Sequence, residues 1–473
     1  MRNILLFVLA SLGLATTVAT GLGCANIIPP QGGPRDSIPP QLIKTIPNDS
    51  STNFKGNRIT FYFDEFVDVQ NIQENLIVSP VPNVLPSVDY KLSTISVKLK
   101  DTLEPNTTYT LNFGNSIKDV DEGNIAKSLT YTFSTGPYID SLELRGRVIL
   151  AETGKIDTSL TVLLHVSSSD SAVIKQKPRY IAKLDGDGNF IFKNLPHSTF
   201  YLYALKDEGG TLRYYNDHQL FGFAAKPIAV SSVNEPVIIY AYSAKPATQT
   251  PLVTNVSTIG RNKIGGTTIE KRLKYQTSLI NNEQDLLSNL VLQFELPLKT
   301  FDSTKVRLTI DSTFTQVAGY RLIRDSTSRS IQLVNTWKEN SIYHLILDRD
   351  FASDSFGRKL LKSDTLSFKT KKLADYGKLK LRFRNLDVSK NPVLLFISNE
   401  TLFKSFPLTG PDFYQPLFFP GEYELRILYD DNRNGKWDPG EFFGKHKQPE
   451  IVQPVQRHIS VKSNTDNDFE LQL

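Results

Sequence analysis

The chain of 473 residues contains one cysteine, one methionine and six scattered histidines. With only Cys24, it cannot form an internal disulfide or a cysteine-ligated metal centre. It also lacks the His-Glu-x-x-His metal pair, the Gly-x-Ser-x-Gly elbow, the phosphate-binding glycine loop and the dinucleotide fingerprint. The net charge of +5 is spread along the whole chain, which leaves no basic patch for nucleic acid. We therefore predict a protein that is not an enzyme and does not bind nucleic acid.

The first 23 residues have the three-part pattern of a signal peptide. Arg2 supplies a positive charge, residues 4–14 are almost wholly apolar, and small residues lead to Gly23. The cysteine that follows is typical of bacterial lipoproteins, although Gly21 stands where leucine is usual. The alternative is an ordinary signal peptide, or a short membrane anchor with an incidental cysteine. Because serine and threonine interrupt the apolar stretch, and a bilayer span needs about 20 apolar residues, we expect the leader to be removed and Cys24 to be acylated.

Residues 24–40 are rich in proline and glycine, and the sequence from residue 27 reads IIPPQGGPRDSIPP. Proline restricts the backbone and removes a hydrogen-bond donor, so this segment is expected to be a tether rather than part of a core. The expected partner of the lipid anchor is the outer membrane. No acidic stretch follows the cysteine, so the sequence leaves open whether the protein faces the periplasm or the cell surface.

The remainder of the sequence is dominated by strand patterns. Apolar and polar residues alternate over 57–63, 96–100, 109–113 and 129–133, as in half-buried strands. Turn-forming clusters separate these segments, and no long amphipathic helix is apparent. The pattern predicts an all-β protein built from antiparallel sandwiches.

The sequence also repeats itself over long stretches. Residues 106–135 resemble residues 340–370, and residues 200–207 align with residues 423–430. Repeats of this length indicate that a pair of domains has been duplicated. The predicted order is a leader (1–23), a tether (24–40), a first Ig-like domain (41–136), a first transthyretin-like domain (137–244), a divergent second Ig-like domain (245–372) and a second transthyretin-like domain (373–473).

Particular motifs carry a resemblance to known families. The segments Asp36–Pro40, Phe61–Glu65 and Phe133–Thr135 resemble the SbsA-type bacterial Ig-like domain. Gly146–Val148 and the Asp185-Gly-Asp-Gly-Asn stretch resemble a transthyretin-like (carboxypeptidase regulatory) module. With the GGPRDSIPP tether beside Cys24, the whole is similar to Ig-like-domain lipoproteins of Bacteroidota. The resemblance implies a fold and a compartment but little about activity, because such sandwiches host many functions.

One loop has the spacing of a calcium site. Counted from Asp430, oxygen-bearing side chains stand at positions 1, 3, 5, 9 and 12 with glycine at position 6, as in a twelve-residue EF-hand loop. The alternative is a turn in which Asp and Asn bond to their own backbone. Ca²⁺ is therefore a candidate cofactor, and the candidate ligands are Asp430, Asn432, Asn434, Asp438 and Glu441.

The first copy provides a comparison for this loop. It keeps Asp207 but has no equivalent of the later ligands, so the fold itself does not require a metal. We expect residues 442–444 to be the counterpart of residues 220–222. We also expect the Asp-Gly dipeptides at 185–189 to form a hairpin turn rather than a metal site.

The predicted function is that of a non-enzymatic envelope lipoprotein that binds or scaffolds other components. An accessory subunit of an outer-membrane protein complex is the specific role that we expect. The alternative is a carbohydrate-binding lipoprotein of a glycan-uptake system. That alternative depends on the aromatic and polar tract 213–218, in which Tyr214 and Tyr215 could stack on sugar. Aromatic residues more often pack into cores, so the tract could equally be a loop packed onto its own sandwich.

Overall fold

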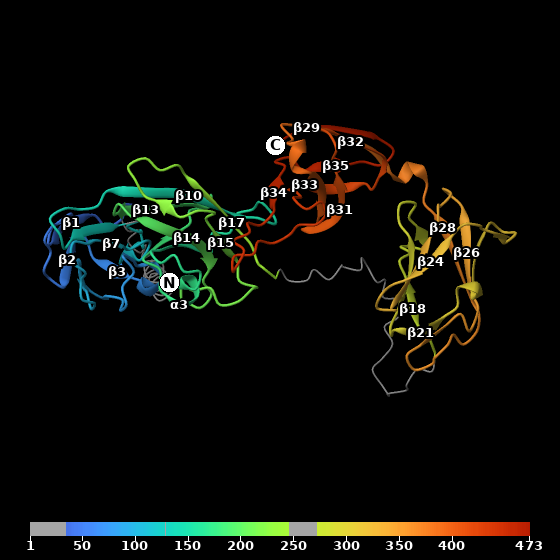
Figure 1. Cartoon of the computed structure of the whole chain (residues 1–473), viewed down its shortest axis with the longest axis horizontal. Coiled ribbons are helices and arrows are strands. Elements are labelled where there is room, and N and C mark those ends of the chain that lie inside the picture. Colours follow the sequence, from blue (N-terminus) through green and yellow to red (C-terminus); the bar gives the residue numbers. More distant parts are fainter. Residues whose placement is uncertain (1–34, 128, 246–271) are drawn as a thin grey trace, which may run out of the picture. The chain divides into compact units, whose positions relative to one another are not determined.

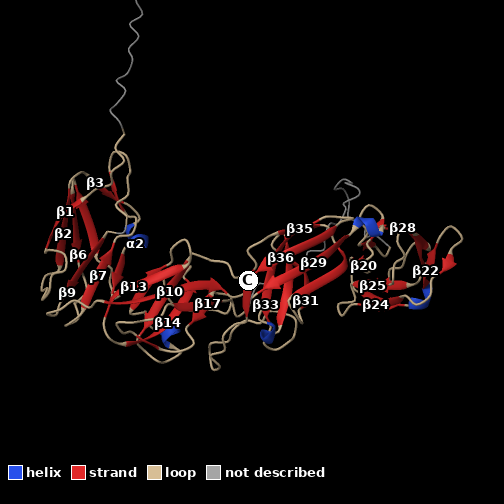
Figure 2. Ribbon diagram, turned by 90° about the horizontal axis from the view of Figure 1, so that it is seen from above, coloured by secondary structure: helices blue, strands red, loops and turns tan. Residues whose placement is uncertain are grey.

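The computed structural model describes residues 35–245, apart from residue 128, and residues 272–473. The predicted leader and Cys24 lie outside the described residues. Strands dominate, and the only helical segments among the described residues are single short turns (Figure 2). None of these described helices is long and apolar enough to cross a membrane. The all-β prediction is confirmed, and the strands form tandem β-sandwiches.

Contacts divide the chain into two compact units. One unit contains residues up to Leu142 together with Lys193–Pro196, and the other contains the remainder. Neither unit tests the four predicted domain boundaries, which stay predictions. In chain order the strands form four sets of sheets, here called sandwiches 1 to 4.

Sandwich 1 consists of a four-stranded sheet ordered β1-β2-β6-β5, a three-stranded sheet ordered β4-β7-β9, and the small pair β3-β8 (Figure 1). The alternating pattern of β2 buries Ile59, Phe61 and Phe63 on one face, because side chains of a strand alternate between its two faces. Its elements are β1 (Leu42–Ile46), β2 (Arg58–Phe63), β3 (Val67–Val69), α2 (Ile72–Asn75), β4 (Ile77–Ser79), β5 (Ser87–Lys91), β6 (Thr94–Lys98), β7 (Thr108–Asn112), β8 (Ile117–Asp119) and β9 (Thr130–Ser134).

Sandwich 2 has a three-stranded sheet ordered β13-β10-β17 and a second sheet ordered β12-β11-β14-β15, with β16 also pairing β14. The β10–β17 pair is parallel. Gly146 lies in this pair, where an added Cβ would stand 2.2 Å from the carbonyl oxygen of Val237. The elements are β10 (Leu142–Leu150), β11 (Leu160–His165), α3 (Ala172–Lys175), β12 (Tyr180–Lys183), β13 (Asn189–Leu195), β14 (Thr199–Lys206), β15 (Phe221–Phe223), β16 (Ile228–Ala229) and β17 (Val237–Ala241).

Sandwich 3 repeats the layout of sandwich 1. Its sheets are ordered β18-β20-β25-β24 and β19-β28-β26-β22-β23, with β21-β27 as the small pair. Its elements are β18 (Tyr275–Thr277), β19 (Glu283–Gln284), β20 (Leu290–Phe294), β21 (Leu298–Phe301), η1 (Ser303–Lys305), β22 (Val306–Ile310), β23 (Thr315–Gln316), β24 (Arg321–Arg324), β25 (Ser330–Val334), β26 (Ile342–Leu347), β27 (Ala352–Asp354) and β28 (Asp364–Thr370).

Sandwich 4 repeats the layout of sandwich 2, with sheets ordered β32-β29-β36 and β31-β30-β33-β34 and with β35 also pairing β33. The β29–β36 pair is parallel, like β10–β17. A short turn, η2 (Leu373–Asp375), precedes it. Its elements are β29 (Gly377–Arg384), η3 (Val388–Lys390), β30 (Pro392–Ser398), β31 (Thr401–Pro407), β32 (Asp412–Phe418), β33 (Gly421–Tyr429), β34 (Ile451–Pro454), β35 (Ile459–Val461) and β36 (Asp466–Gln472).

Two local predictions were wrong. Phe221 pairs with Leu205 in sandwich 2, whereas the equivalent strand of sandwich 4 is β34, which begins at Ile451. Residues 442–444 therefore belong to a longer loop and are not the counterpart of residues 220–222. The Asp-Gly stretch at 185–189 is a turn closed by hydrogen bonds to Asp185, but β12 and β13 lie in different sheets, so it is not a hairpin.

Candidate functional site

The predicted calcium loop begins directly after β33. Asp430 is almost fully buried, with 1 % of its surface exposed. Its carboxylate accepts hydrogen bonds from the backbone N–H of Asn434 at 3.2 Å and of Gly435 at 2.7 Å. Gly435 has a positive φ of 75°, which glycine adopts readily, and this allows the tight bend. The loop thus curls around the Asp430 carboxylate.

Asp438 lies on the other side of the same loop. Its carboxylate accepts hydrogen bonds from the side-chain amides of Asn432 and Asn434, the latter at 2.7 Å. Hydrogen bonds therefore link four of the five predicted ligands, since Asn434 also donates to Asp430. Carboxylate and amide oxygens are the ligand types that Ca²⁺ prefers. In the described part of the chain, however, no three acidic, histidine or cysteine side chains are grouped as metal ligands.

Glu450 is an acidic residue of this site that the loop spacing did not reveal. Its side chain is 2 % exposed and accepts hydrogen bonds from the backbone N–H of Asp431 and of Asp438, both at 3.0 Å. Burial raises the pKa of Glu450, and the neighbouring Asp438 and Asp430 carboxylates raise it further. A buried carboxylate beside two others is an arrangement that a bound cation would stabilise.

Glu441, the predicted twelfth-position ligand, is engaged elsewhere. Its carboxylate lies 2.8 Å from Lys445 Nζ, and its backbone pairs with that of Lys447. Asp430, Asn432, Asn434 and Asp438 are thus linked through one loop, and Glu450 is the further acid that contacts its backbone.

The same loop places an aromatic side chain in the core of sandwich 2. Phe442 is 6 % exposed, and its ring centroid lies 4.9 Å from that of Phe223, 5.3 Å from Phe221 and 5.6 Å from Tyr203. All four residues belong to one buried cluster. Phe442 therefore completes the core of a sandwich that ends some 200 residues earlier in the chain.

Polar contacts surround this aromatic anchor. The backbone N–H of Val452 donates to the carbonyl oxygen of Ala151 at 2.9 Å, which joins strand β34 to the loop after β10. Gln448 Nε2 donates to the carbonyl oxygen of Phe223 at 3.1 Å. His446 Nε2 lies 2.9 Å from the carboxylate of Asp170. Sandwiches 2 and 4 are thus held together by packing and by hydrogen bonds.

Gly440 allows the close approach at this contact. A Cβ at this position would lie 2.7 Å from the ring of Tyr242, closer than real side chains come. The feature was not predicted, because a glycine beside a proline in an acidic loop is typical of an ordinary turn.

The two tyrosines of the carbohydrate hypothesis do not lie together on the surface. Tyr214 is 7 % exposed and packs against Phe221 and Phe443, whereas Tyr215 is 50 % exposed. A pocket of about 620 Å³ lies beside Tyr214 and the loop residues 438–443, but the tyrosine pair offers no single stacking platform for a sugar.

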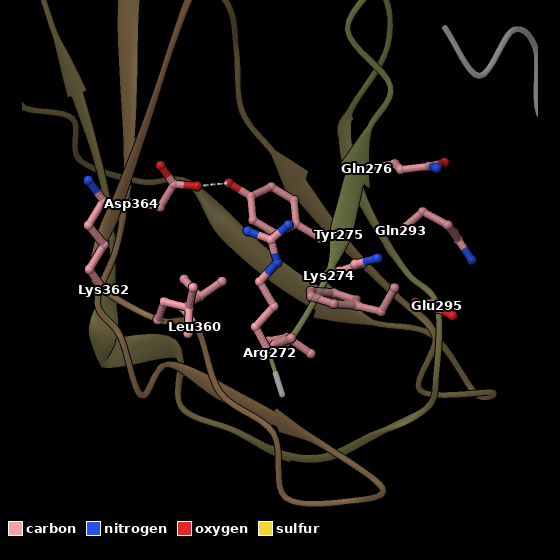
Figure 3. Close-up of a pocket in the computed structure, with 12 residues that line it drawn as sticks. Arg272, Lys274, Tyr275, Gln276, Gln293, Glu295, Leu360, Lys362 and Asp364 are labelled. Carbon is pink, nitrogen blue, oxygen red and sulfur yellow. Dashed lines mark hydrogen bonds between the residues drawn. The ribbon is translucent and has the colours of Figure 1, made fainter. Parts of the chain in front are cut away.

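A second concave region lies at the edge of sandwich 3, with a volume of about 890 Å³ (Figure 3). Its wall contains Tyr275, whose hydroxyl group donates to the Asp364 carboxylate at 2.7 Å, and burial raises the pKa of Tyr275. The side chains of Arg272, Lys274 and Lys362 also line it.

Comparisons with known proteins identify one part of the chain. Residues 36–135 match the family model of the bacterial Ig-like domain. The match covers sandwich 1 and confirms the Ig-like resemblance for that segment. No match to a curated protein was found. The resemblances to transthyretin-like modules and to Bacteroidota lipoproteins stay predictions.

Several solved structures show weak similarity. The N-terminal part of the bacterial S-layer protein SbsC is 16% identical over 43% of this chain and 44% of that chain, with a TM-score of 0.16. The Bacillus anthracis TIE protein is 11% identical over 94% and 75%, with a TM-score of 0.17. BcpA, the major pilin subunit of Bacillus cereus, is 8% identical over 70% and 99%, with a TM-score of 0.16. This chain thus spans less than half of the SbsC fragment, and TM-scores this low do not establish a shared fold.

Proposed function

We propose that the protein is a non-enzymatic envelope lipoprotein that serves as a scaffold or binding module for other envelope components. The observation that carries the proposal is the buried contact between sandwiches 2 and 4, centred on Phe442. In this contact the loop that carries Trp437 and Phe442 packs sandwich 4 against sandwich 2. Two sandwiches that pack together in this way present a joint β-surface, which suits a scaffold.

The anchor in this proposal is Cys24, acylated after removal of the leader. Two or more acyl chains on one residue give stable membrane attachment, whereas one chain binds only marginally. The expected location is the outer membrane, and the role is that of an accessory subunit in a membrane-protein complex.

Crosslinking in intact cells tests the scaffold role. A short amine-reactive reagent should join surface lysines of this chain to a second envelope protein, and mass spectrometry would identify the linked peptides. Recovery of only uncrosslinked monomer, under conditions that crosslink a known envelope complex, would sink the accessory-subunit proposal.

We also propose that the loop from Asp430 to Glu450 binds Ca²⁺. The support is chemical: the Asp430 and Asp438 carboxylates and two asparagine residues are linked by hydrogen bonds in one glycine-containing bend. The buried Glu450 carboxylate accepts a hydrogen bond from the backbone of the same loop. Bound calcium would stabilise the loop that carries Phe442. The ligands in this proposal are Asp430, Asn432, Asn434 and Asp438. Glu450 supplies the further acid that the spacing assigned to Glu441, because the Glu441 carboxylate pairs with Lys445.

A further inference from the structure

Sandwich 1 carries a group of exposed apolar side chains at one end. Phe66, Leu92 and Val120 are 57 %, 61 % and 56 % exposed. Phe66 directly precedes β3, Val120 directly follows β8, and Leu92 lies in the turn between β5 and β6. Large apolar side chains exposed together in this way mark a contact surface.

Backbone hydrogen bonds show that these three residues are neighbours. The N–H of Val120 donates to the carbonyl oxygen of Phe66 at 3.2 Å, and the N–H of Val67 donates to that of Leu92 at 3.0 Å. Because Val67 and Asp119 pair and are both buried, the adjacent Phe66 and Val120 project away from the core. We call Phe66, Leu92 and Val120 the tip patch.

The tip patch lies where the chain enters sandwich 1. Arg35 donates to the carbonyl oxygen of Glu122 at 3.1 Å, and the Asn124 side chain donates to that of Asp36 at 3.1 Å. Figure 2 shows β3 at this end of the sandwich. Cys24 precedes Arg35 by 35 − 24 = 11 residues, which span at most about 40 Å when fully extended. A lipid on Cys24 would therefore keep the tip patch close to the bilayer.

We propose that the tip patch is a membrane-contact surface that rests on the zwitterionic lipid headgroups around the anchor. This inference rests on the proposed lipid anchor. Carboxylates outnumber cations around the patch: Asp64, Glu65, Asp121 and Glu122 lie beside Phe66 and Val120, whereas Lys91 adjoins Leu92 and Arg35 bonds to Glu122. Since the excess of carboxylates would be repelled by anionic lipid, the surface suits a neutral bilayer. Apolar side chains at the headgroup boundary would orient sandwich 1 relative to the bilayer and restrict its motion about the tether.

The absence of other cysteines makes a direct test simple. The chain from residue 24 onward, with Cys24→Ser and a hexahistidine tag at its start, is tethered to phosphatidylethanolamine and phosphatidylcholine vesicles through a nickel-chelating lipid. An environment-sensitive dye is attached at Leu92→Cys or, as a matched control, at Val84→Cys. Val84 is 50 % exposed and lies beyond the opposite end of β5.

We expect the emission at position 92 to rise about twofold or more and to shift to the blue as the dye enters the headgroup region. The dye at position 84 should not respond. Adding Phe66→Ser and Val120→Ser should remove most of the response at 92 without changing the melting temperature, since both side chains are exposed. Anionic phosphatidylglycerol in the vesicles should weaken it.

Equal responses at positions 92 and 84, no response at either, or a stronger response with anionic lipid would each overturn the proposal. So would a photo-crosslinker at position 92 that captures a protein rather than lipid in intact cells. The vesicle experiment uses the tag in place of the acyl chains. A finding that Cys24 is not acylated would therefore refute the lipid anchor, but it would leave the vesicle result unaffected.

Discussion

Replacing Phe442 with alanine should weaken the contact between sandwiches 2 and 4. Only 6 % of Phe442 is exposed, and its ring centroid lies within 5.6 Å of three ring centroids of sandwich 2. Truncating a buried phenylalanine costs about 3–5 kcal/mol. Because Phe442 lies on a loop that can relax, we expect about 3 kcal/mol, near the lower end of that range.

Trp437 supplies a local probe for this measurement. It packs against the clusters of both sandwiches, and its Nε1–H donates to the carbonyl oxygen of Glu450 at 2.8 Å. The chain has only two tryptophans, so Trp337→Phe in every sample makes the fluorescence specific to the loop. In urea, Phe442→Ala should shift the Trp437 transition to a lower concentration. The control Phe356→Ala removes a side chain that is 78 % exposed and should cost less than about 0.5 kcal/mol.

A matching readout is amide exchange at Val452, whose N–H bonds to Ala151. Exchange there should become faster in Phe442→Ala, while peptides of sandwich 3 should keep their protection. If Phe442→Ala shifted the Trp437 transition no more than Phe356→Ala does, the docked arrangement of the two sandwiches would be refuted.

Three further predictions concern single residues. His165 is 1 % exposed, and burial lowers its pKa to about 4 from 6.5, so the unfolded chain binds the extra proton first as the pH falls. The free energy of unfolding should therefore drop by about 3 kcal/mol between pH 6.5 and pH 4. In His165→Leu, the free energy of unfolding measured in urea should lose this pH dependence. Calcium should raise the melting temperature of the protein. Asp438→Ala should abolish this rise, whereas Asp207→Ala in the equivalent loop of sandwich 2 should leave it unchanged. A melting temperature that changes with neither calcium nor chelator would refute the metal proposal. Gly146→Ala should lower the free energy of unfolding by about 3 kcal/mol, because the added Cβ overpacks the sheet. Gly186→Ala, with nothing within 4 Å of the new Cβ, should leave the free energy of unfolding in urea nearly unchanged.

The strands could be predicted because their burial follows a local rule. In β2 the alternation of apolar and polar residues is matched by alternating burial from Arg58 to Phe63. The position of a turn was equally clear at Asp185, but which sheets it connects was not. Turn chemistry determines how the backbone bends, whereas pairing depends on strands far away in sequence.

The candidate site was predictable only where its residues are close in sequence. Regular spacing identified Asp430 and Asp438, which lie eight residues apart, 438 − 430. Glu450 lies outside that spacing, and it reaches the loop only because β34 returns alongside β33. The prediction for Phe442, as part of a counterpart of residues 220–222, was wrong. Its partners belong to sandwich 2, and nothing in the local sequence distinguishes a docking aromatic from a residue of its own core.

We propose that the chain acts from a lipid anchor at Cys24. Mass spectrometry of the N-terminal peptide from the membrane fraction tests it most directly, with a Cys24→Ser variant analysed in parallel. We expect a peptide that begins at Cys24 and carries two or three acyl chains, and we expect the variant to leave the membrane fraction. An unmodified Cys24, or a mature chain that begins at another residue, would contradict it.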